Sequence, residues 1–449
     1  MSEREKGNPP RFSRRAALTL AAPLALTGCG LFNGTFLGPT NKPLPGKRQD
    51  VMAPRHALRV DTSLTTPVTL PPAKPNPDWP QPGENAAHDP GHPAFGGRLA
   101  QTWRTDIGAG STYRNRITAT PVVAGGRVHT MDSAGHVDAF DIRTGRRIWR
   151  FNTRPKGAKS TNVGGGVSTD GGRVYAATGL AEVLAMDAAT GRLIWRKSIP
   201  GPARSAPTVA DGRLFVALIG DQIVALSTKD GARLWTHQAQ SAATSILGLP
   251  APAVADGLVV TGFGSGALLT LRADSGSLVW SDSLASAGSS LLNLSAITAP
   301  PVIDRNRVFA IGLGGVMLSL DLRAGRRLWE RDVAGGQMPW VAGDWVFILS
   351  SDQKLACLSR TDGTVRWVSS LPAFRNMKHS RGPIFWWGPI LAGGRLLVAS
   401  THNQLATINP QTGAILTTTR LPGPAALAPI IAGGTTYLIT SDATLLALG

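Results

Sequence analysis

The sequence predicts an all-β chain built from one four-stranded unit that recurs along its length. Glycine and proline account for 52 and 33 of the 449 residues, and at this density they interrupt helices. Hydrophobic residues make up 42% of the chain and charged residues only 16%, so a large core can form and disorder throughout is excluded. In addition, a segment with a glycine and a tryptophan returns along most of the chain. This combination is typical of a repeat protein made of short strands and tight turns.

Residues 1–28 have the organisation of a lipoprotein signal peptide. A basic stretch precedes an apolar run of 12 residues, Ala16–Thr27, which is too short to span a bilayer. The run ends in Leu26-Thr27-Gly28-Cys29, which resembles a bacterial lipobox and makes Cys29 the predicted lipidation site. Arg14-Arg15 resembles part of a twin-arginine motif, and the sequence leaves the export route open. By resemblance to lipoprotein sorting signals, Gly30 favours the periplasmic face of the outer membrane.

Residues 29–98 are predicted to form a proline-rich tether. Thirteen of the 33 prolines lie between Gly30 and Arg98, and such a chain cannot build helices or sheet ladders. We expect an extended, semi-rigid segment that holds the globular part away from the membrane. His88 and His92 lie within it, and we expect them to be solvated rather than to bind a metal.

The remaining residues, 99–449, contain seven copies of one segment, in which a strand leads to a turn glycine and then to a tryptophan four residues later. The seven glycines, spaced 38 to 50 residues apart, are Gly145, Gly191, Gly231, Gly276, Gly325, Gly363 and Gly413. Six tryptophans follow them, at Trp149, Trp195, Trp235, Trp280, Trp329 and Trp367, and Thr417 takes the seventh place. Because these residues recur in every unit, we predict structural roles. The glycine makes the turn, the tryptophan packs between units, and Asp141, Asp187 and Asp321 bond the turn backbone.

Eight tight turns lie between these copies, each joining two apolar strands. They fall at Gly125-Gly126, Gly171-Gly172, Asp211-Gly212, Asp256-Gly257, Asp304-Arg305-Asn306, Gly343-Asp344, Gly393-Gly394 and Gly433-Gly434. Gly-Gly and Asp-Gly pairs suit the positive φ of hairpin turns. A proline precedes seven of the eight hairpins, where a strand begins and no N–H is needed.

The eight hairpins supply 16 strands, eight third strands follow them, and seven fourth strands follow the turn glycines. The total is 31, one short of eight complete units. The segment Leu99–Trp103 carries a tryptophan without a hairpin before it, and it can supply the missing strand. We therefore predict an eight-bladed β-propeller with four-stranded antiparallel blades over residues 99–449. Its last blade is closed by the N-terminal strand near Trp103, which removes an open edge.

The spacing of Asp, Thr-Gly and Trp in these copies resembles the quinoprotein-type repeat. That repeat occurs in pyrroloquinoline-quinone (PQQ) dehydrogenases and in the BamB family of outer-membrane assembly lipoproteins. The lipobox, the proline-rich segment and a propeller without further domains together resemble the BamB family. The resemblance implies a non-catalytic, monomeric scaffold of the β-barrel assembly (BAM) complex. Such a protein binds the POTRA domains of BamA, assists the insertion of outer-membrane proteins and needs no cofactor.

Two long inter-blade insertions, Gln238–Leu249 and Ala285–Thr298, carry apolar residues. Binding residues concentrate in such loops, and these two resemble the family's contact with BamA. The predicted partner-binding residues are Ile246, Leu247, Leu292, Leu294 and Ile297. The polar positions of the family's contact are not kept, because Leu247 replaces an arginine, and Ala296 and Thr298 replace aspartates. A third insertion, Pro372–Trp387, is basic and aromatic, and its role stays open.

Two other functions remain as alternatives. The formal net charge of +18 fits a propeller that binds another envelope partner or an anionic polymer, although scattered arginines do not indicate nucleic-acid binding. A PQQ dehydrogenase would need calcium ligands and often has a vicinal cysteine pair. Glu182 and Glu330 are the only glutamates in residues 99–449, and no Cys-Cys pair occurs, so we expect neither catalysis nor a metal site. Cys357 is predicted to be a buried thiol.

Overall fold

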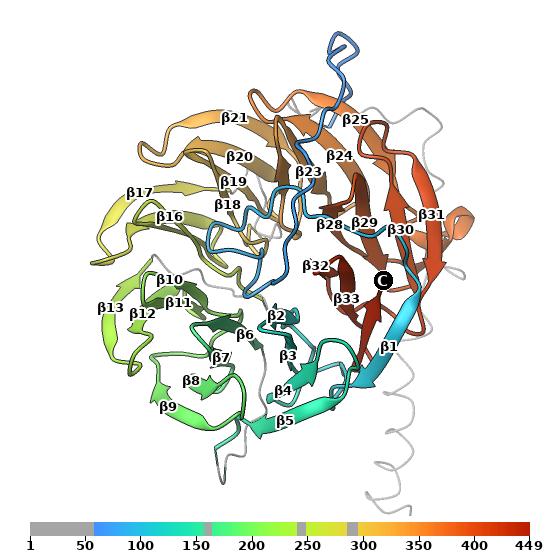
Figure 1. The fold of residues 1–449 in the computed structure, drawn as a ribbon. Coiled ribbons are helices and arrows are strands. Elements are labelled where there is room, and N and C mark those ends of the chain that lie inside the picture. Colours follow the sequence, from blue (N-terminus) through green and yellow to red (C-terminus); the bar gives the residue numbers. More distant parts are fainter. Residues whose placement is uncertain (1–57, 156, 158–163, 240–247, 285–294) are drawn as a thin grey trace, which may run out of the picture. The chain divides into compact units, whose positions relative to one another are not determined.

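Eight four-stranded antiparallel sheets surround a central axis (Figure 1). The computed structural model describes residues 58–155, 157, 164–239, 248–284 and 295–449, which lie in one compact unit spanning 54–449. The predicted fold, an eight-bladed β-propeller, is confirmed. Residues 1–57, with Cys29 and the signal peptide, lie outside the described residues.

Each blade is a meander whose innermost strand comes first. Blade 1 contains β2 (Val122–Ala124), β3 (Arg127–Met131), β4 (His136–Asp141) and β5 (Arg147–Asn152); blade 2 contains β6 (Gly165–Asp170), β7 (Arg173–Thr178), β8 (Glu182–Asp187) and β9 (Leu193–Ser198). Blade 3 contains β10 (Thr208–Ala210), β11 (Arg213–Leu218), β12 (Gln222–Ser227) and β13 (Arg233–Gln238); blade 4 contains β14 (Ala253–Ala255), β15 (Leu258–Gly262), β16 (Ala267–Arg272) and β17 (Leu278–Ser283). Blade 5 contains β18 (Val302–Asp304), β19 (Arg307–Ile311), β20 (Val316–Asp321) and β21 (Arg327–Asp332); blade 6 contains β22 (Trp340–Ala342), β23 (Trp345–Leu349), β24 (Lys354–Ser359) and β25 (Val365–Ser370). Blade 7 contains β28 (Trp386–Ala392), β29 (Arg395–Ser400), β30 (Gln404–Ile408) and β31 (Ile415–Arg420).

Blade 8 joins the two ends of the propeller. It contains β32 (Ile430–Ala432), β33 (Thr435–Ile439), β34 (Thr444–Leu448) and, as its outer strand, β1 (Gln101–Asp106). Trp103 faces Ala447 across this antiparallel pair. The closing strand therefore lies where the tryptophan pattern predicts it, and the ring has no unpaired end.

The hairpin turns explain the Gly-Gly and Asp-Gly pairs. In seven of the eight turns both residues adopt positive φ, including Arg305 and Asn306, and in the eighth only Gly343 does.

The turns between third and fourth strands are stabilised instead by hydrogen bonds to an aspartate side chain. The Asp141 carboxylate accepts hydrogen bonds from the Thr144 N–H and hydroxyl at 2.9 and 2.8 Å, and Asp187 bonds Thr190 in the same way. Asp321 accepts from the Arg323 and Ala324 N–H groups. The predicted structural role of these aspartates is confirmed.

Each repeat tryptophan packs on the turn glycine of the next blade. The Trp149 ring lies on Gly191, where an added Cβ would stand 2.6 Å from ring atoms, and its Nε1 donates to the Ala188 carbonyl at 3.1 Å. Six further contacts repeat this arrangement, at Trp103–Gly145, Trp195–Gly231, Trp235–Gly276, Trp280–Gly325, Trp329–Gly363 and Trp367–Gly413. We call each of these seven contacts a seam. At each seam, the tryptophan ring of one blade fills the space that a side chain at the turn glycine of the next blade would occupy.

The place of Thr417 in blade 7 follows from the ring closure. The third and fourth strands of blade 8 are β34 and β1, which come from opposite ends of the chain and have no turn between them. A tryptophan at position 417 would have no turn glycine to cover. Thr417 instead hydrogen-bonds its cross-strand neighbour Thr407, at 2.7 Å between hydroxyl oxygens.

Residues 58–98 do not form the predicted free tether. They cross one face of the propeller, in front of the blades in Figure 1, and bury Val68, Trp79 and His88. His88 is fully buried and not solvated, and its Nδ1–H donates to the Pro301 carbonyl at 2.8 Å. The tether prediction is therefore wrong for this part of the segment. Val68 and Trp79 are apolar anchors that the high proline content obscured.

The stretch 76–93 makes a circuit of the ring. Its backbone and side chains hydrogen-bond to the inner strand, or to the first turn, of all eight blades. The partners, from blade 8 through blades 1 to 7, are Asn76–Gly433, Trp79–Val123, Pro80–Thr169, Gln81–Val209, Ala86–Val254, Ala87–Ile303, Gly91–Trp340 and Pro93–Gly393. Because an inner strand has one unpaired edge, this circuit satisfies backbone groups that the blades leave free.

Candidate partner-binding face

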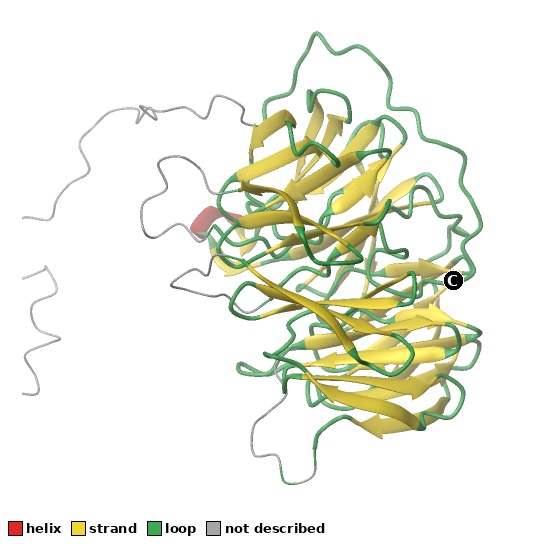
Figure 2. Ribbon diagram, turned by 90° about the vertical axis from the view of Figure 1, so that its left-hand side faces the viewer, coloured by secondary structure: helices red, strands yellow, loops and turns green. Residues whose placement is uncertain are grey.

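The two faces of the ring differ in what covers them. In a four-stranded meander the first and third turns lie at one end, and the second turn and the inter-blade connection lie at the other. The end with the first and third turns carries residues 58–98, and we call it the N-terminal face. The opposite end, which we call the connection face, carries the inter-blade connections (Figure 2).

The two predicted partner-binding insertions belong to the connection face. One joins β13 to β14 and the other joins β17 to β18, so they flank blade 4. Ile246, Leu247, Leu292 and Leu294 lie outside the described residues. The start of each insertion is held by a backbone hydrogen bond, because the Ala239 N–H donates to the Asp221 carbonyl and the Leu284 N–H donates to the Gly266 carbonyl, both at 2.9 Å.

Ile297 is not a surface contact. Its side chain is fully buried, and a Cβ on Gly262 would lie 2.4 Å from its Cγ2. Its N–H donates to the Phe263 carbonyl at 2.9 Å. Ile297 thus fills the core between blades 4 and 5, because Gly262 leaves room for it. The choice of Ile297 as a partner-binding residue is corrected accordingly.

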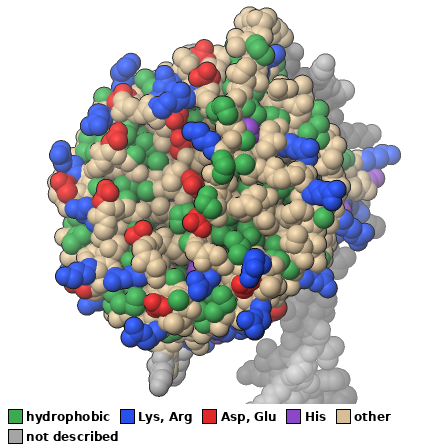
Figure 3. Space-filling model, in the orientation of Figure 1, with side chains coloured by type: hydrophobic (Ala, Val, Ile, Leu, Met, Phe, Trp, Pro, Cys, Tyr) green, Lys and Arg blue, Asp and Glu red, His purple; other side chains and the backbone are tan. Residues whose placement is uncertain are grey.

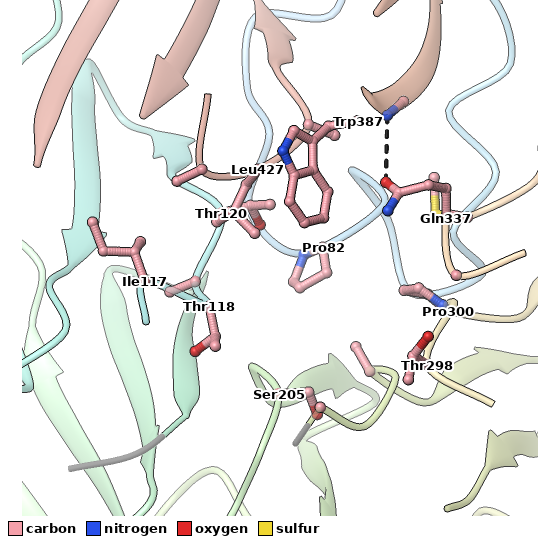
Figure 4. A pocket seen from close by; sticks show the side chains of 18 of the residues that line it. Pro82, Ile117, Thr118, Thr120, Ser205, Thr298, Pro300, Gln337, Trp387 and Leu427 are labelled. Carbon is pink, nitrogen blue, oxygen red and sulfur yellow. Dashed lines mark hydrogen bonds between the residues drawn. The ribbon is translucent and has the colours of Figure 1, made fainter. Parts of the chain in front are cut away.

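A pocket of about 550 Å³ occupies the central channel. Inter-blade connections supply most of its wall, and Trp79, Pro82 and Gly83 belong to the segment on the N-terminal face. Figure 4 shows Pro82 among wall residues that include Thr118, Ser205, Thr298 and Trp387. The circuit of residues 76–93 therefore contributes to closing the channel on its own side.

The described lining of this pocket has no carboxylate, histidine or cysteine. Its polar side-chain groups are hydroxyls, two arginines, the indole N–H groups of Trp79 and Trp387, and the Gln337 amide, whose Oε1 accepts from the Gly388 N–H at 3.4 Å. Histidine and carboxylates are the commonest general acids and bases, and carboxylates are the charged ligands of calcium. Within the described part of the chain, no group of three or more His, Cys, Asp or Glu side chains could hold a metal ion. The described lining residues thus contain no carboxylate that could bind calcium.

The titratable residues that the sequence singles out have structural partners. Burial raises the pKa of the Cys357 thiol, which is free and packed in the core, as predicted. Glu182 pairs with Arg196 at 3.0 Å, and Glu330 pairs with Arg327 at 2.7 Å, both near the outer strands. Neither glutamate lines the channel.

The third insertion forms a small hairpin. Its strands β26 (Phe374–Asn376) and β27 (Arg381–Pro383) flank a 3-10 turn, η1 (Met377–His379). Trp386 and Trp387 belong to β28 and not to the insertion, and Trp387 lines the channel. This short turn is the one helical element among the described residues, and none of them forms a helix that could cross a membrane.

The closed ring of four-stranded blades with Trp–Gly seams defines a propeller of the quinoprotein-repeat class. Residues 133–369 and 374–449 match the family model described as outer membrane protein assembly factor BamB. The chain belongs to this family.

Individual relatives agree with the family match. The BamB protein of Yersinia pestis is 26% identical over 321 residues, which cover 70% of this chain and 79% of that protein. The crystal structure of BamB from Moraxella catarrhalis superposes with a TM-score of 0.67 at 18% identity, covering 78% of this chain and 99% of that one. Quinohemoprotein alcohol dehydrogenase from Comamonas testosteroni superposes with a TM-score of 0.64 at 14% identity, covering 84% and 81%. At these identities the superpositions show a shared fold alone.

Proposed function

We propose that this protein is a non-catalytic scaffold lipoprotein of the BAM complex, which binds the POTRA domains of BamA and assists insertion of outer-membrane proteins. The observation that carries the proposal is the family match over most of the propeller. The lipobox-like sequence at Cys29 supports a lipid anchor on the periplasmic face of the outer membrane. The channel lining supports a binding role over a dehydrogenase role, because it lacks carboxylates.

We further propose that BamA contacts the connection face beside blade 4. Both insertions predicted to bind it connect to blade 4 there, and both start on hydrogen-bonded backbone. Apolar anchors within such loops dominate many protein interfaces. Ile246, Leu247, Leu292 and Leu294 remain the proposed contact residues.

The test is co-purification of BamA from detergent-solubilised outer membrane. We expect BamA to elute with the parent protein, and the double variant Ile246→Asp, Leu292→Asp to lose it while its thermal midpoint is unchanged. Ile148→Asp is the control, because Ile148 is an exposed apolar residue (44%) on the outer strand of blade 1. Retention of BamA by the double variant contradicts the contact assignment. Elution of an anionic polymer without BamA supports the alternative function.

The anchor is tested separately with Cys29→Ala. We expect the parent to incorporate labelled palmitate and to sediment with outer membranes, and the variant to do neither. An unlabelled parent protein would overturn the lipidation proposal without affecting the proposed contact with BamA.

A further inference from the structure

The hairpin Phe374–Pro383 lies in a part of the chain without acidic residues. No Asp or Glu occurs from Gly363 to Ser441, which is 79 residues, whereas the chain's average of 28 in 449 would place about five there. Six Lys or Arg side chains fall in the same stretch. By contrast, acidic and basic side chains are interspersed over most of the N-terminal face (Figure 3).

Three of the six Lys and Arg side chains of this stretch lie in the hairpin. Arg375, Lys378, His379 and Arg381 are all exposed, and no ion pair joins any of them to another described residue. Arg381 faces Asn376 across the two strands, which brings both arms of the hairpin together. At the tip, Met377 is 62% exposed. The hairpin thus presents an apolar residue at its tip together with three positively charged side chains.

The hairpin is held in place at its base. Trp386 donates its Nε1–H to the Pro372 carbonyl and its backbone N–H to Gln353 Oε1, both at 2.9 Å. The Ile384 N–H donates to Ala373 at 2.8 Å. Phe385, which is 53% exposed, exchanges hydrogen bonds with Thr401 of blade 7 at 2.9 and 3.0 Å. A cationic tip fixed in this way loses little conformational entropy when it binds.

The charge continues along the connection face of blade 7. His402 follows Thr401 in the turn between β29 and β30, and Arg420 at the end of β31 faces Gln404. Both side chains are exposed. Arg420 therefore adds a positive charge on the same side of the ring as the hairpin. In Figure 2 the hairpin's short helix, drawn red, lies at the left, opposite the face that Figure 1 shows.

We propose that the hairpin Phe374–Pro383 is a membrane-contact element that binds bilayers with anionic phospholipid headgroups. The cations attract phosphates, and Met377 enters the boundary between headgroups and acyl chains. This combination of an apolar tip and flanking basic residues is what interfacial binding requires. A flat acidic protein surface would use the charges but would leave the protruding methionine without a role. The proposal does not rest on binding to BamA.

The test is sedimentation with vesicles, using the full chain with Cys29→Ser so that no acyl chain at this position contributes. We expect binding to phosphatidylethanolamine vesicles that contain phosphatidylglycerol, weak binding to phosphatidylcholine vesicles, and loss of the difference in high salt. The triple variant Arg375→Gln, Lys378→Gln, Arg381→Gln should bind anionic vesicles more weakly by about tenfold to a hundredfold. Met377→Ser should weaken binding by about threefold at unchanged charge.

The matched control is Arg143→Gln, Arg146→Gln, Arg192→Gln, which removes three exposed charges from turns on the N-terminal face. It should bind vesicles nearly as the parent does. An equal loss of vesicle binding in the control would show that net charge alone decides binding. Unchanged vesicle binding of the hairpin variant would exclude the hairpin as the membrane-contact element. Either result overturns the proposal.

Discussion

The seams show how one residue constrains another across two blades. Gly276 has a φ of +71°, and its missing Cβ leaves space that the Trp235 ring occupies. The Trp235 indole donates in turn to Ala273, three residues before that glycine, at 3.0 Å. The glycine is needed for two separate reasons, its backbone conformation and its lack of a side chain. These reasons can be measured separately.

Gly276→Ala should destabilise the propeller more than Gly257→Ala. The two glycines have nearly equal φ, +71° and +72°. A Cβ at Gly276 would lie 2.6 Å from the Trp235 ring, whereas a Cβ at Gly257 would have no other atom within 4 Å. We expect a cost of about 1–2 kcal/mol from backbone strain in both variants, and a further ~1–3 kcal/mol from overpacking in Gly276→Ala. Urea unfolding of the two variants measures the difference. Equal midpoints would show that the ring contact contributes nothing.

At the scale of elements, the segment 58–98 acts as an additional layer on the blades. Trp79 is 2% exposed and stacks with Trp340 of blade 6 across the channel, with ring centroids 6.3 Å apart. Its backbone also pairs with Val123 of blade 1 at 2.7 and 2.8 Å. One residue thus links blades 1 and 6, which are not adjacent in the ring.

Trp79→Ala should release the segment. Removal of a buried tryptophan costs about 3–5 kcal/mol, and we expect residues around it to become sensitive to limited proteolysis while the blades stay resistant. Tyr113→Ala is the control, because Tyr113 is 93% exposed. An unchanged cleavage pattern in Trp79→Ala would mean that the hydrogen-bonded circuit holds without its anchor.

The same segment makes stability depend on pH through Asp89. Burial, together with the neighbouring Asp304, raises the pKa of Asp89 from 3.8 to about 7. Asp304 itself is paired with Arg360 at 2.5 Å and with Arg305 at 3.2 Å. The unfolded chain loses the Asp89 proton near pH 4 and the folded chain keeps it to about pH 7. The contribution of this group to stability therefore falls as the pH rises between these values.

Asp89→Asn should flatten this dependence. We expect the parent's thermal midpoint to decrease from pH 5 to pH 8 by more than that of the variant, since asparagine cannot ionise. Scanning calorimetry at both pH values provides the comparison. Parallel decreases in parent and variant would place the pH dependence elsewhere.

For the whole molecule, the closing strand β1 decides whether eight blades form a ring. Trp103 in β1 makes the same seam as the other repeat tryptophans, with Nε1 donating to Ile142 of blade 1 at 3.0 Å and its ring on Gly145. Blade 8 has no covalent turn between its last two strands. The seam at Trp103 and the β1–β34 ladder are thus what hold blade 1 to blade 8 at their outer edge.

Trp103→Ala should therefore destabilise the entire ring and not one blade. We expect a loss of about 3–5 kcal/mol, typical for a buried aromatic residue, with a single shifted transition by both circular dichroism and tryptophan fluorescence. Trp103→Phe should recover part of the lost free energy of unfolding. A separate early transition in Trp103→Ala, limited to blade 8, would contradict cooperative closure.

The ring was predictable because its signals are local. A glycine at a turn and a tryptophan four residues later recur with each blade, and the Trp103 strand completes the count. The circuit at Asn76–Pro93 gave no such signal, because its prolines do favour an extended chain, and only the assembled inner strands offer it partners. Ile297 was misplaced for a similar reason, since its burial depends on the space left by Gly262 of another strand.

The ring closure also sets an order of events during folding. Thr102 and Ala447, which are hydrogen-bonded in blade 8, are 345 residues apart in sequence. The other ladders in the blades form between neighbouring strands, so they close short loops early, whereas β1 must wait for the last residues of the chain. Until β34 arrives, β1 has an open strand edge, the kind of surface that pairs with other chains. A chain synthesised from its N-terminus therefore carries β1 with an open edge until β34 has been made.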